Sequence, residues 1–350
     1  MKRISITAML ALSASLAHAQ SSVSLYGLVD GGIRWVNGTK GGPTIEYSGA
    51  LTPDRFGLQG SEDLGDGTKV IFRLESQFES SGALQTSNVL FGRDAYVGLD
   101  GPYGRLTLGR QFTPFEDLAI HLDPSGIGGA DIAIAPDVLL GSNFFTLDSW
   151  FNNTVKYTTT LAGFKLSGSY SLGGVAGNER AGTTYSAAAS YSTGRLLAGV
   201  AYQRMYNADA SQFAQNYDAG ASLQLGPVRT YLSYMGLRVS GTALAPAQRR
   251  DDVPQGGVVW QITPQITLTA AYYDDIANNL GNQSGASGHK QTAYLIGEYF
   301  ISRRTELYFE VDRNHFSGAY TDDPLNLLVL NMSPGTSGLT GMSIGLATRF

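Results

Sequence analysis

Two alternating segments, VLFGRDAYVGL at Val89–Leu99 and GRLTLGRQF at Gly104–Phe112, are separated only by the residues DGPY. Alternation of apolar and polar side chains is typical of half-buried β-strands, and a Gly-Pro turn between two such segments indicates a hairpin. The hairpin is followed by a segment of another kind, residues 113–149. This segment is too long for an ordinary connection, and long connections in compact proteins are usually functional or disordered.

The long segment is acidic and partly apolar. It contains no Lys or Arg, and its carboxylates are Glu116, Asp117, Asp123, Asp131, Asp137 and Asp148. Its apolar residues, such as Phe115, Leu118 and Phe144, are too many for a solvated tail, so we expect it to fold back against protein. The preceding hairpin carries Arg93 and Arg110. In a closed barrel, an acidic loop opposite basic wall residues would form a charged constriction.

The first 19 residues have the pattern of a secretory signal peptide. Lys2 and Arg3 precede an apolar run, and Ala17-His18-Ala19 forms a cleavage site. The run is shorter than the roughly 20 residues that a spanning helix needs. The mature chain would begin at Gln20, with 22 basic and 29 acidic residues and a formal charge of −7. That charge argues against nucleic acid as a partner.

Composition narrows the class of the exported chain. It has no cysteine, so it is not a small disulfide-stapled domain. It is rich in glycine and tyrosine, with 44 and 19 residues, and only 15% of its residues are charged. No later apolar run is long enough for a membrane helix. This is the composition of an outer-membrane β-barrel, whose strands are apolar only at alternate positions.

Alternating segments recur along the whole chain, whereas helical periodicity is weak. We predict sixteen strands: Ser22–Val36, Pro53–Ser61, Thr68–Glu79, Val89–Leu99, Gly104–Phe112, Asn152–Thr160, Phe164–Leu172, Thr184–Ser192, Leu196–Tyr206, Tyr217–Leu225, Val228–Arg238, Asp252–Ile262, Ile266–Asp275, Lys290–Phe300, Glu306–Asn314 and Leu339–Phe350. Their connections alternate between short and long, as in single-chain bacterial barrels with short periplasmic turns. No further domain is visible, so we predict that residues 20–350 form one all-β transmembrane barrel.

Several motifs then carry a resemblance to a known family. They are SVSLYGLVDGGI, DRFGLQGSEDLGDGTKVIFRLE, FGRDAYVGL, YGRLTLGRQ and NNTVKY, and the chain closes on Phe350. With the signal peptide, the chain resembles the general diffusion porins of Gram-negative bacteria, particularly the beta-proteobacterial group. The resemblance implies a homotrimer in the outer-membrane lipid bilayer, with the third external loop folded inward and no cofactor. It also implies that the barrel-assembly machinery recognises Phe350.

This chain departs from the family pattern at two places. Trp150 stands where the family commonly has a basic residue, before the NNTVKY segment. The usual Pro-Glu-Phe-Gly-Gly stretch of the loop is represented at best by residues 123–126. Because of the first departure, this chain lacks one member of the cluster of basic residues that the family has. Because of the second, the path of its loop need not follow that of the family.

The function predicted from these features is passive diffusion of ions and small hydrophilic solutes through a water-filled channel. We expect a basic wall at Arg55, Arg93 and Arg110 to face Glu116, Asp117, Asp123 and Asp131 on the loop. Each arginine could instead serve as a structural partner for a nearby carboxylate or carbonyl. The loop carboxylates favour a weak preference for cations. The alternative is a substrate-specific channel with saturable uptake.

Catalytic and metal chemistry have little support. The pattern G-x-S-x-G occurs at 341–345, but no His or acid follows it, so it does not indicate a hydrolase. The histidines lack the spacing of metal ligands. We therefore predict no enzyme and no metal site, although paired aspartates in external loops could hold calcium loosely.

The predicted strand Val89–Leu99 indicates that part of the outer wall is covered by protein. Asp94 shares the parity of Tyr96 in the predicted strand Val89–Leu99, so that strand has no clean apolar face. An outward Asp is costly in lipid. We therefore expect this wall to be covered by an external loop or a neighbouring subunit, in keeping with the trimer.

Overall fold

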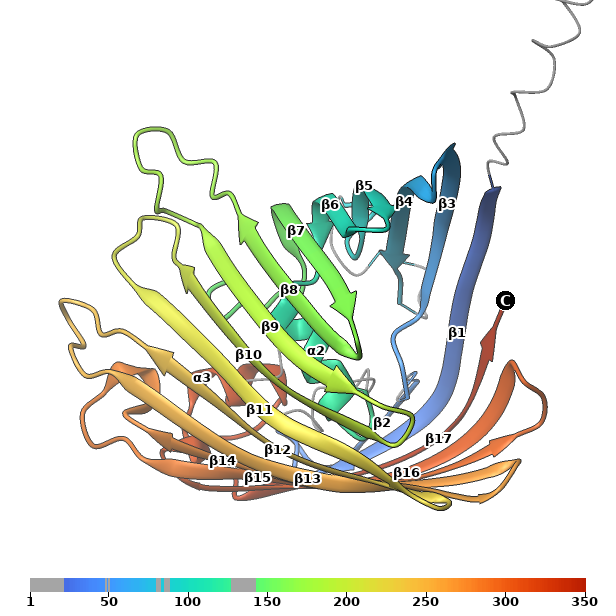
Figure 1. Cartoon of the computed structure of the whole chain (residues 1–350). Coiled ribbons are helices and arrows are strands. Elements are labelled where there is room, and N and C mark those ends of the chain that lie inside the picture. The colour runs from blue at the N-terminus through green and yellow to red at the C-terminus, as the bar shows by residue number, and fades with distance from the viewer. Residues whose placement is uncertain (1–21, 48, 50, 80–82, 85–88, 127–142) are drawn as a thin grey trace, which may run out of the picture.

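The computed structural model describes residues 22–47, 49, 51–79, 83–84, 89–126 and 143–350 (Figure 1). Its strands form one antiparallel sheet that closes into a barrel, because β1 (Ser22–Asn37) pairs with the last strand, β17 (Gly338–Arg349). The sheet has 17 strands. One of them, β2 (Thr44–Tyr47), is a four-residue strand that pairs only with the end of β1. The other sixteen form the wall, which confirms the predicted barrel.

The remaining wall strands follow one another around the barrel in chain order. They are β3 (Arg55–Gly65), β4 (Thr68–Gln77), β5 (Ala95–Gly101), β6 (Gly104–Gln111), β7 (Phe151–Leu161), β8 (Phe164–Ser171), β9 (Thr184–Ser192), β10 (Leu196–Tyr206), β11 (Phe213–Leu225), β12 (Val228–Val239), β13 (Arg249–Thr263), β14 (Ile266–Asn278), β15 (Gly288–Phe300) and β16 (Thr305–Gly318). Among the described residues, no helix is long and apolar enough to cross a membrane. The predicted signal segment, residues 1–19, lies outside the described residues.

The wall alternates as a lipid-facing barrel requires. Leu58, Val97 and Leu108 point outward and stay exposed on the isolated chain, whereas Gln203 and Asn216 point inward and are buried. Apolar side chains thus face the surroundings and polar ones face the interior, the reverse of a protein in water. The alternation itself is local, because side chains in a strand point to opposite faces with period two.

The structure corrects the predicted hairpin in one respect. Strand β5 begins at Ala95, not at Val89, and residues 90–93 form a turn and bends. Two backbone hydrogen bonds, from Arg93 N to Glu75 O and from Glu75 N to Asp94 O, hold the preceding segment against β4. The Asp94 carboxylate pairs with Arg73, an inward-facing residue of β4. The inference of an outward Asp was therefore wrong.

The long connections pack together at one mouth of the barrel. The 3-10 helices η1 (Leu280–Asn282) and η2 (Ala319–Thr321) and the helix α3 (Pro324–Val329) belong to these connections. Their side chains form a buried apolar cluster with the ends of wall strands; it contains Val36, Ala277, Leu280, Phe316, Tyr320, Leu330, Met332 and Leu339. None of these short helices was predicted. Each is too short to show helical periodicity, and tertiary packing stabilises it.

Barrel closure gives a first testable prediction, at Phe350. Its backbone exchanges two hydrogen bonds with Gly27, at 3.0 and 3.2 Å, and a Cβ at Gly27 would overlap the Phe350 ring. Deleting Phe350 removes both bonds, worth about 1 kcal/mol each, and the ring contact. We expect the yield of folded barrel to fall about tenfold or more on refolding into detergent. Heat-modifiable electrophoretic mobility measures that yield.

The control deletes Leu244, which is 98% exposed in the connection between β12 and β13. This residue takes no part in closing the sheet, so its loss leaves the refolding yield unchanged. Equal yields from the two deletions would contradict the role of Phe350.

Candidate functional site

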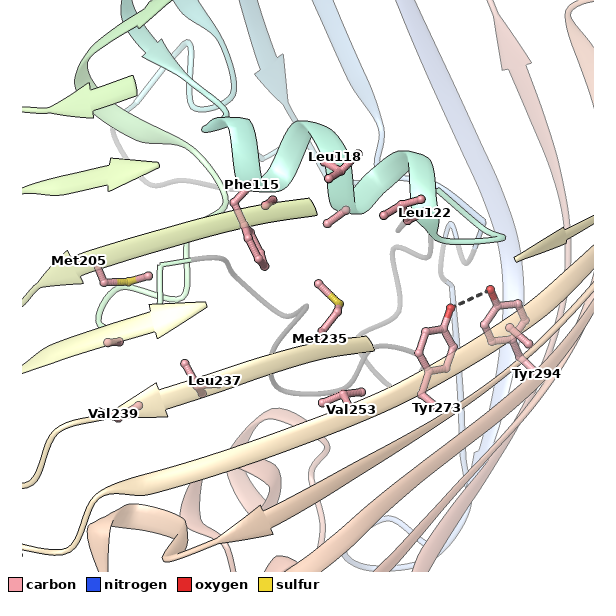
Figure 2. Close-up of a cluster of buried hydrophobic side chains, with 14 of the residues drawn as sticks. Phe115, Leu118, Leu122, Met205, Met235, Leu237, Val239, Val253, Tyr273 and Tyr294 are labelled. Atoms are coloured by element: carbon pink, nitrogen blue, oxygen red, sulfur yellow. Dashed lines mark hydrogen bonds between the residues drawn. The ribbon is translucent and has the colours of Figure 1, made fainter. Parts of the chain in front are cut away.

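A helix inside the barrel organises the interior. Helix α2 (Pro114–Leu122) follows β6 and packs against the inner side of β9, β10, β11 and β12 (Figure 1). Phe115, Leu118 and Leu122 of this helix enter a buried apolar cluster with Met205, Met235, Leu237, Val253 and Tyr273 of the wall (Figure 2). Burial of these side chains stabilises the helix by roughly 2 kcal/mol each.

Polar contacts fix both ends of α2 to the wall. At its start, Phe115 N donates a 3.0 Å hydrogen bond to Ser186 Oγ on β9, and Thr113 Oγ1 donates to Gln203 Oε1 on β10. Just beyond its end, Asp123 Oδ2 accepts a hydrogen bond from the Tyr273 hydroxyl on β14. The described part of the long connection therefore reaches from β6 to the far wall of the barrel.

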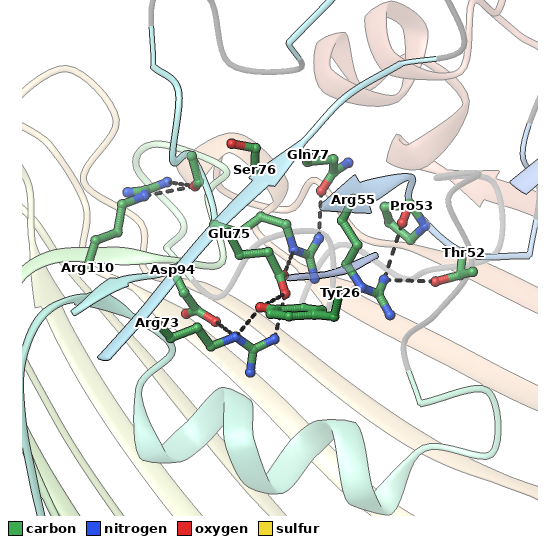
Figure 3. A network of polar contacts seen from close by, with 12 residues as sticks. Tyr26, Thr52, Pro53, Arg55, Arg73, Glu75, Ser76, Gln77, Asp94 and Arg110 are labelled. Carbon is green, nitrogen blue, oxygen red and sulfur yellow. Dashed lines mark hydrogen bonds and ion pairs between the residues drawn. The ribbon is translucent and has the colours of Figure 1, made fainter. Parts of the chain in front are cut away.

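A charged network, comprising Tyr26, Arg73, Glu75, Arg93 and Asp94, covers the inner face of β1, β4 and the segment before β5 (Figure 3). Arg73 and Arg93 each pair with the Glu75 carboxylate through N–O distances of 2.5 Å. The Tyr26 hydroxyl donates to the same carboxylate at 2.7 Å and accepts from Arg73 Nε. Arg73 Nε also lies 3.1 Å from Asp94 Oδ2. Glu75 thus holds two guanidinium groups side by side.

Trp150 lies beside this network. The guanidinium carbon of Arg93 is 4.3 Å from the centroid of the Trp150 ring. The same ring stacks on Phe112, with centroids 4.5 Å apart. In this chain an aromatic platform therefore accompanies Arg93 at the position where the family commonly has a basic residue. A cation over an indole face is stabilised by the ring quadrupole.

Between the network and α2 lies a water-accessible hollow of about 690 Å³. Its lining includes five basic side chains, Arg73, Arg93, Arg105, Lys156 and Lys165, and four acidic ones, Glu75, Asp94, Asp100 and Asp117. Lys156 on β7 ties the start of the long connection to the wall, because its ammonium lies 3.0 Å from Asp117 of α2 and 2.9 Å from the Phe112 carbonyl. The described lining is therefore strongly polar and almost balanced in charge.

Of the three predicted basic residues, only Arg93 lines this hollow. Arg55 is close to the network, and it donates to Thr52 Oγ1 and to the Pro53 carbonyl (Figure 3). Arg110 lies apart from the hollow. Its position on β6 has the same parity as Leu108 and pairs with Ala95, and these positions face outward. It binds the Gly92 carbonyl and pairs with Asp148 at 2.6 Å. Arg110 thus ties two connections together and does not face the hollow.

The predicted acidic residues do not all lie at the hollow. Asp117 lines the hollow and pairs with Lys156. Glu116 and Asp123 are buried, with 4% and 3% exposure, and Asp123 accepts hydrogen bonds from Tyr273 and Ser125. These two therefore lie within packed protein. Asp131 is outside the described residues.

Sequence reasoning missed Arg73, Glu75 and Lys156 as site residues. Arg73 and Glu75 share one parity in a strand whose other face is apolar, which was a usable signal that both point into the barrel. A second signal was available on β12. There Met235, Leu237 and Val239 point inward and are buried, which indicates that an apolar segment covers this wall from inside.

Comparison with known proteins agrees with this architecture. Residues 7–319 match the family model described as Gram-negative porin. An outer membrane porin protein of Bordetella pertussis is 28% identical over 334 residues, which cover 85% of this chain and 80% of the relative. An anion-selective porin from Comamonas acidovorans has a similar fold, with a TM-score of 0.76 and 21% identity over 95% of this chain and all of that one.

A third similar fold is a trimer form of OmpT, an outer membrane protein of Vibrio cholerae. It has a TM-score of 0.68 and 15% identity, covering 94% of this chain and 99% of that one. The family match spans most of the chain, and the closed barrel with a polar interior is what such a family requires. The chain belongs to the Gram-negative porins of the outer membrane.

Proposed function

We propose that ions and small hydrophilic solutes cross this porin through the hollow between the charged network and α2. The observation that carries the proposal is the position of α2, which is fixed to the wall at both ends and has a polar hollow beside it. Charges of both signs in a narrow passage orient water and disfavour apolar solutes.

Solute flux into liposomes tests the proposal. We expect the swelling rate to rise linearly with solute concentration and to fall steeply with solute size. Saturation at low concentration would instead favour the alternative, a substrate-specific channel. As a local test, Thr158→Trp places a bulky side chain in the hollow lining. It should lower single-channel conductance, and unchanged conductance would place the path elsewhere.

The weak preference for cations stays a prediction. The mature chain carries a formal charge of −7, which favours cations, whereas five basic and four acidic side chains in the hollow favour anions slightly. Nearby charges in a narrow passage outweigh distant ones, because the Debye length at physiological salt is only about 8 Å. The reversal potential in a KCl gradient measures the sign.

We also propose that three copies assemble in the outer membrane after cleavage behind Ala19. The trimer form of OmpT supports this assembly by analogy of fold. We expect a species of three chains, each starting at Gln20, that dissociates on heating. Native and denatured masses measure both features, and a monomer would contradict the assembly.

A further inference from the structure

The outer face of β10–β13 carries a row of basic and polar side chains near the long connections. Direct cross-strand neighbours join Arg204 to Gln215, Gln215 to Arg238, and Arg238 to Arg250. The row points away from the channel, because the alternate residues Gln203, Leu237 and Asp251 are buried inside the barrel. The row therefore lies on the surface that meets the membrane.

The arginines of this row differ in how their charge is balanced. Arg238 pairs with Asp252 at 2.6 Å, and the Tyr217 and Tyr234 hydroxyls donate to the same carboxylate. Among the described residues, no carboxylate pairs with Arg204, and its Nε has no hydrogen-bond partner although it is buried. Arg204 is therefore a cation without a counter-charge in the described protein.

Aromatic rings hold Arg204 in place. Its guanidinium carbon lies 3.9 Å from the Phe213 centroid and 5.2 Å from the Tyr206 centroid. The guanidinium of Arg180, from the connection before β9, lies 5.6 Å from the same Tyr206 ring. Two cations thus converge on one ring. An anion bound beside these guanidinium groups would offset their positive charge, and phosphate suits the planar donors of arginine.

An apolar groove of about 810 Å³ lies on the same outer face, farther from the long connections. Its floor is made of small side chains, including Ala189, Ala198, Ala219 and Ala221, and Tyr191 and Leu232 rise beside it. Val200 lines the groove, and Arg204 lies four residues farther along β10, roughly 13 Å away. A molecule lying along the strand can reach both features.

We propose that this face binds a phosphate-bearing lipid of the surrounding leaflet, with an acyl chain in the groove and the phosphate at Arg204 and Arg180. The positive charge of Arg204 and Arg180 favours a lipid over a second protein chain as the occupant. The membrane supplies phosphate groups at the level where the strands leave the apolar layer, and basic pockets on membrane proteins bind lipid head groups. The site lies outside the channel, so it is independent of the path proposed for solutes.

The test titrates delipidated trimer in detergent with phosphatidic acid and with diacylglycerol of the same chains, and native mass spectrometry measures binding. We expect phosphatidic acid to bind about tenfold more tightly. Arg204→Gln should remove most of that difference, and Ala219→Phe should weaken both lipids by filling the groove. The matched control is Arg313→Gln, an exposed outer-face arginine of β16 bonded to Thr340, which should leave binding unchanged.

Equal binding of the two lipids would overturn the proposal, as would an equal effect of Arg313→Gln and Arg204→Gln. Inorganic phosphate that binds as tightly as phosphatidic acid would show an anion site without a lipid. Loss of the trimer in Ala219→Phe would show that the groove is a subunit interface. Heat-modifiable mobility and single-channel conductance confirm that each variant is folded, because none of the three substituted residues faces the channel.

Discussion

Tyr273→Phe is expected to increase the open-channel current noise and the mean conductance of this porin. The Tyr273 hydroxyl and the Asp123 carboxylate are buried, with 2% and 3% exposure, and their hydrogen bond ties the end of α2 to β14. Removing the Tyr273 hydroxyl deprives the buried Asp123 oxygen of this hydrogen-bond donor. The loss destabilises the docked position of the helix end by about 1–3 kcal/mol. The share of channels with a displaced helix end should rise about tenfold to a hundredfold.

Planar-bilayer recordings measure this effect, and Tyr272→Phe is the matched control. Tyr272 is the preceding residue on β14, but it points outward and is 47% exposed. Its hydroxyl has no part in holding α2, so the control channel should be as quiet as the unmodified one. If the two variants gave the same noise, the Asp123 tie would not hold the helix.

Glu75→Gln is expected to produce the largest shift of the reversal potential toward anions. Its carboxylate is 2% exposed and pairs with both Arg73 and Arg93 at the edge of the hollow. The amide keeps the size of the side chain but removes its charge, so two guanidinium groups remain without this partner. Breaking a buried ion pair by removing one partner costs about 3–5 kcal/mol, so the barrel should also unfold at a lower temperature.

A matched control is Glu62→Gln on β3, where Glu62 is exposed with outward parity near a short turn. The reversal potential should not change in this variant. Arg73→Gln should shift the potential in the opposite direction, toward cations. A shift of the same sign in Glu75→Gln and Arg73→Gln would mean that rearrangement of the network, and not its charge, controls the passage.

The sequence by itself determined the barrel. Strand alternation has period two and depends on neighbours within one segment, so strands such as β9 (Thr184–Ser192) and β10 (Leu196–Tyr206) were predicted with their observed bounds. The even number of predicted strands agrees with the closed antiparallel sheet, in which β1 pairs with β17. The expectation of a signal segment at residues 1–19 rests on sequence alone and stays a prediction.

Which charged residues meet in the channel was decided by the tertiary structure. Arg110 keeps the outward parity of Leu108, and contacts with two separate connections, through the Gly92 carbonyl and the Asp148 carboxylate, hold it away from the hollow. Helix α2 has nine residues, too few for a stable helix in isolation, and packing against the barrel interior stabilises it. Its position selects Arg73, Glu75 and Lys156 from all inward-facing charges, because contacts between distant strands leave no periodic signal in the sequence.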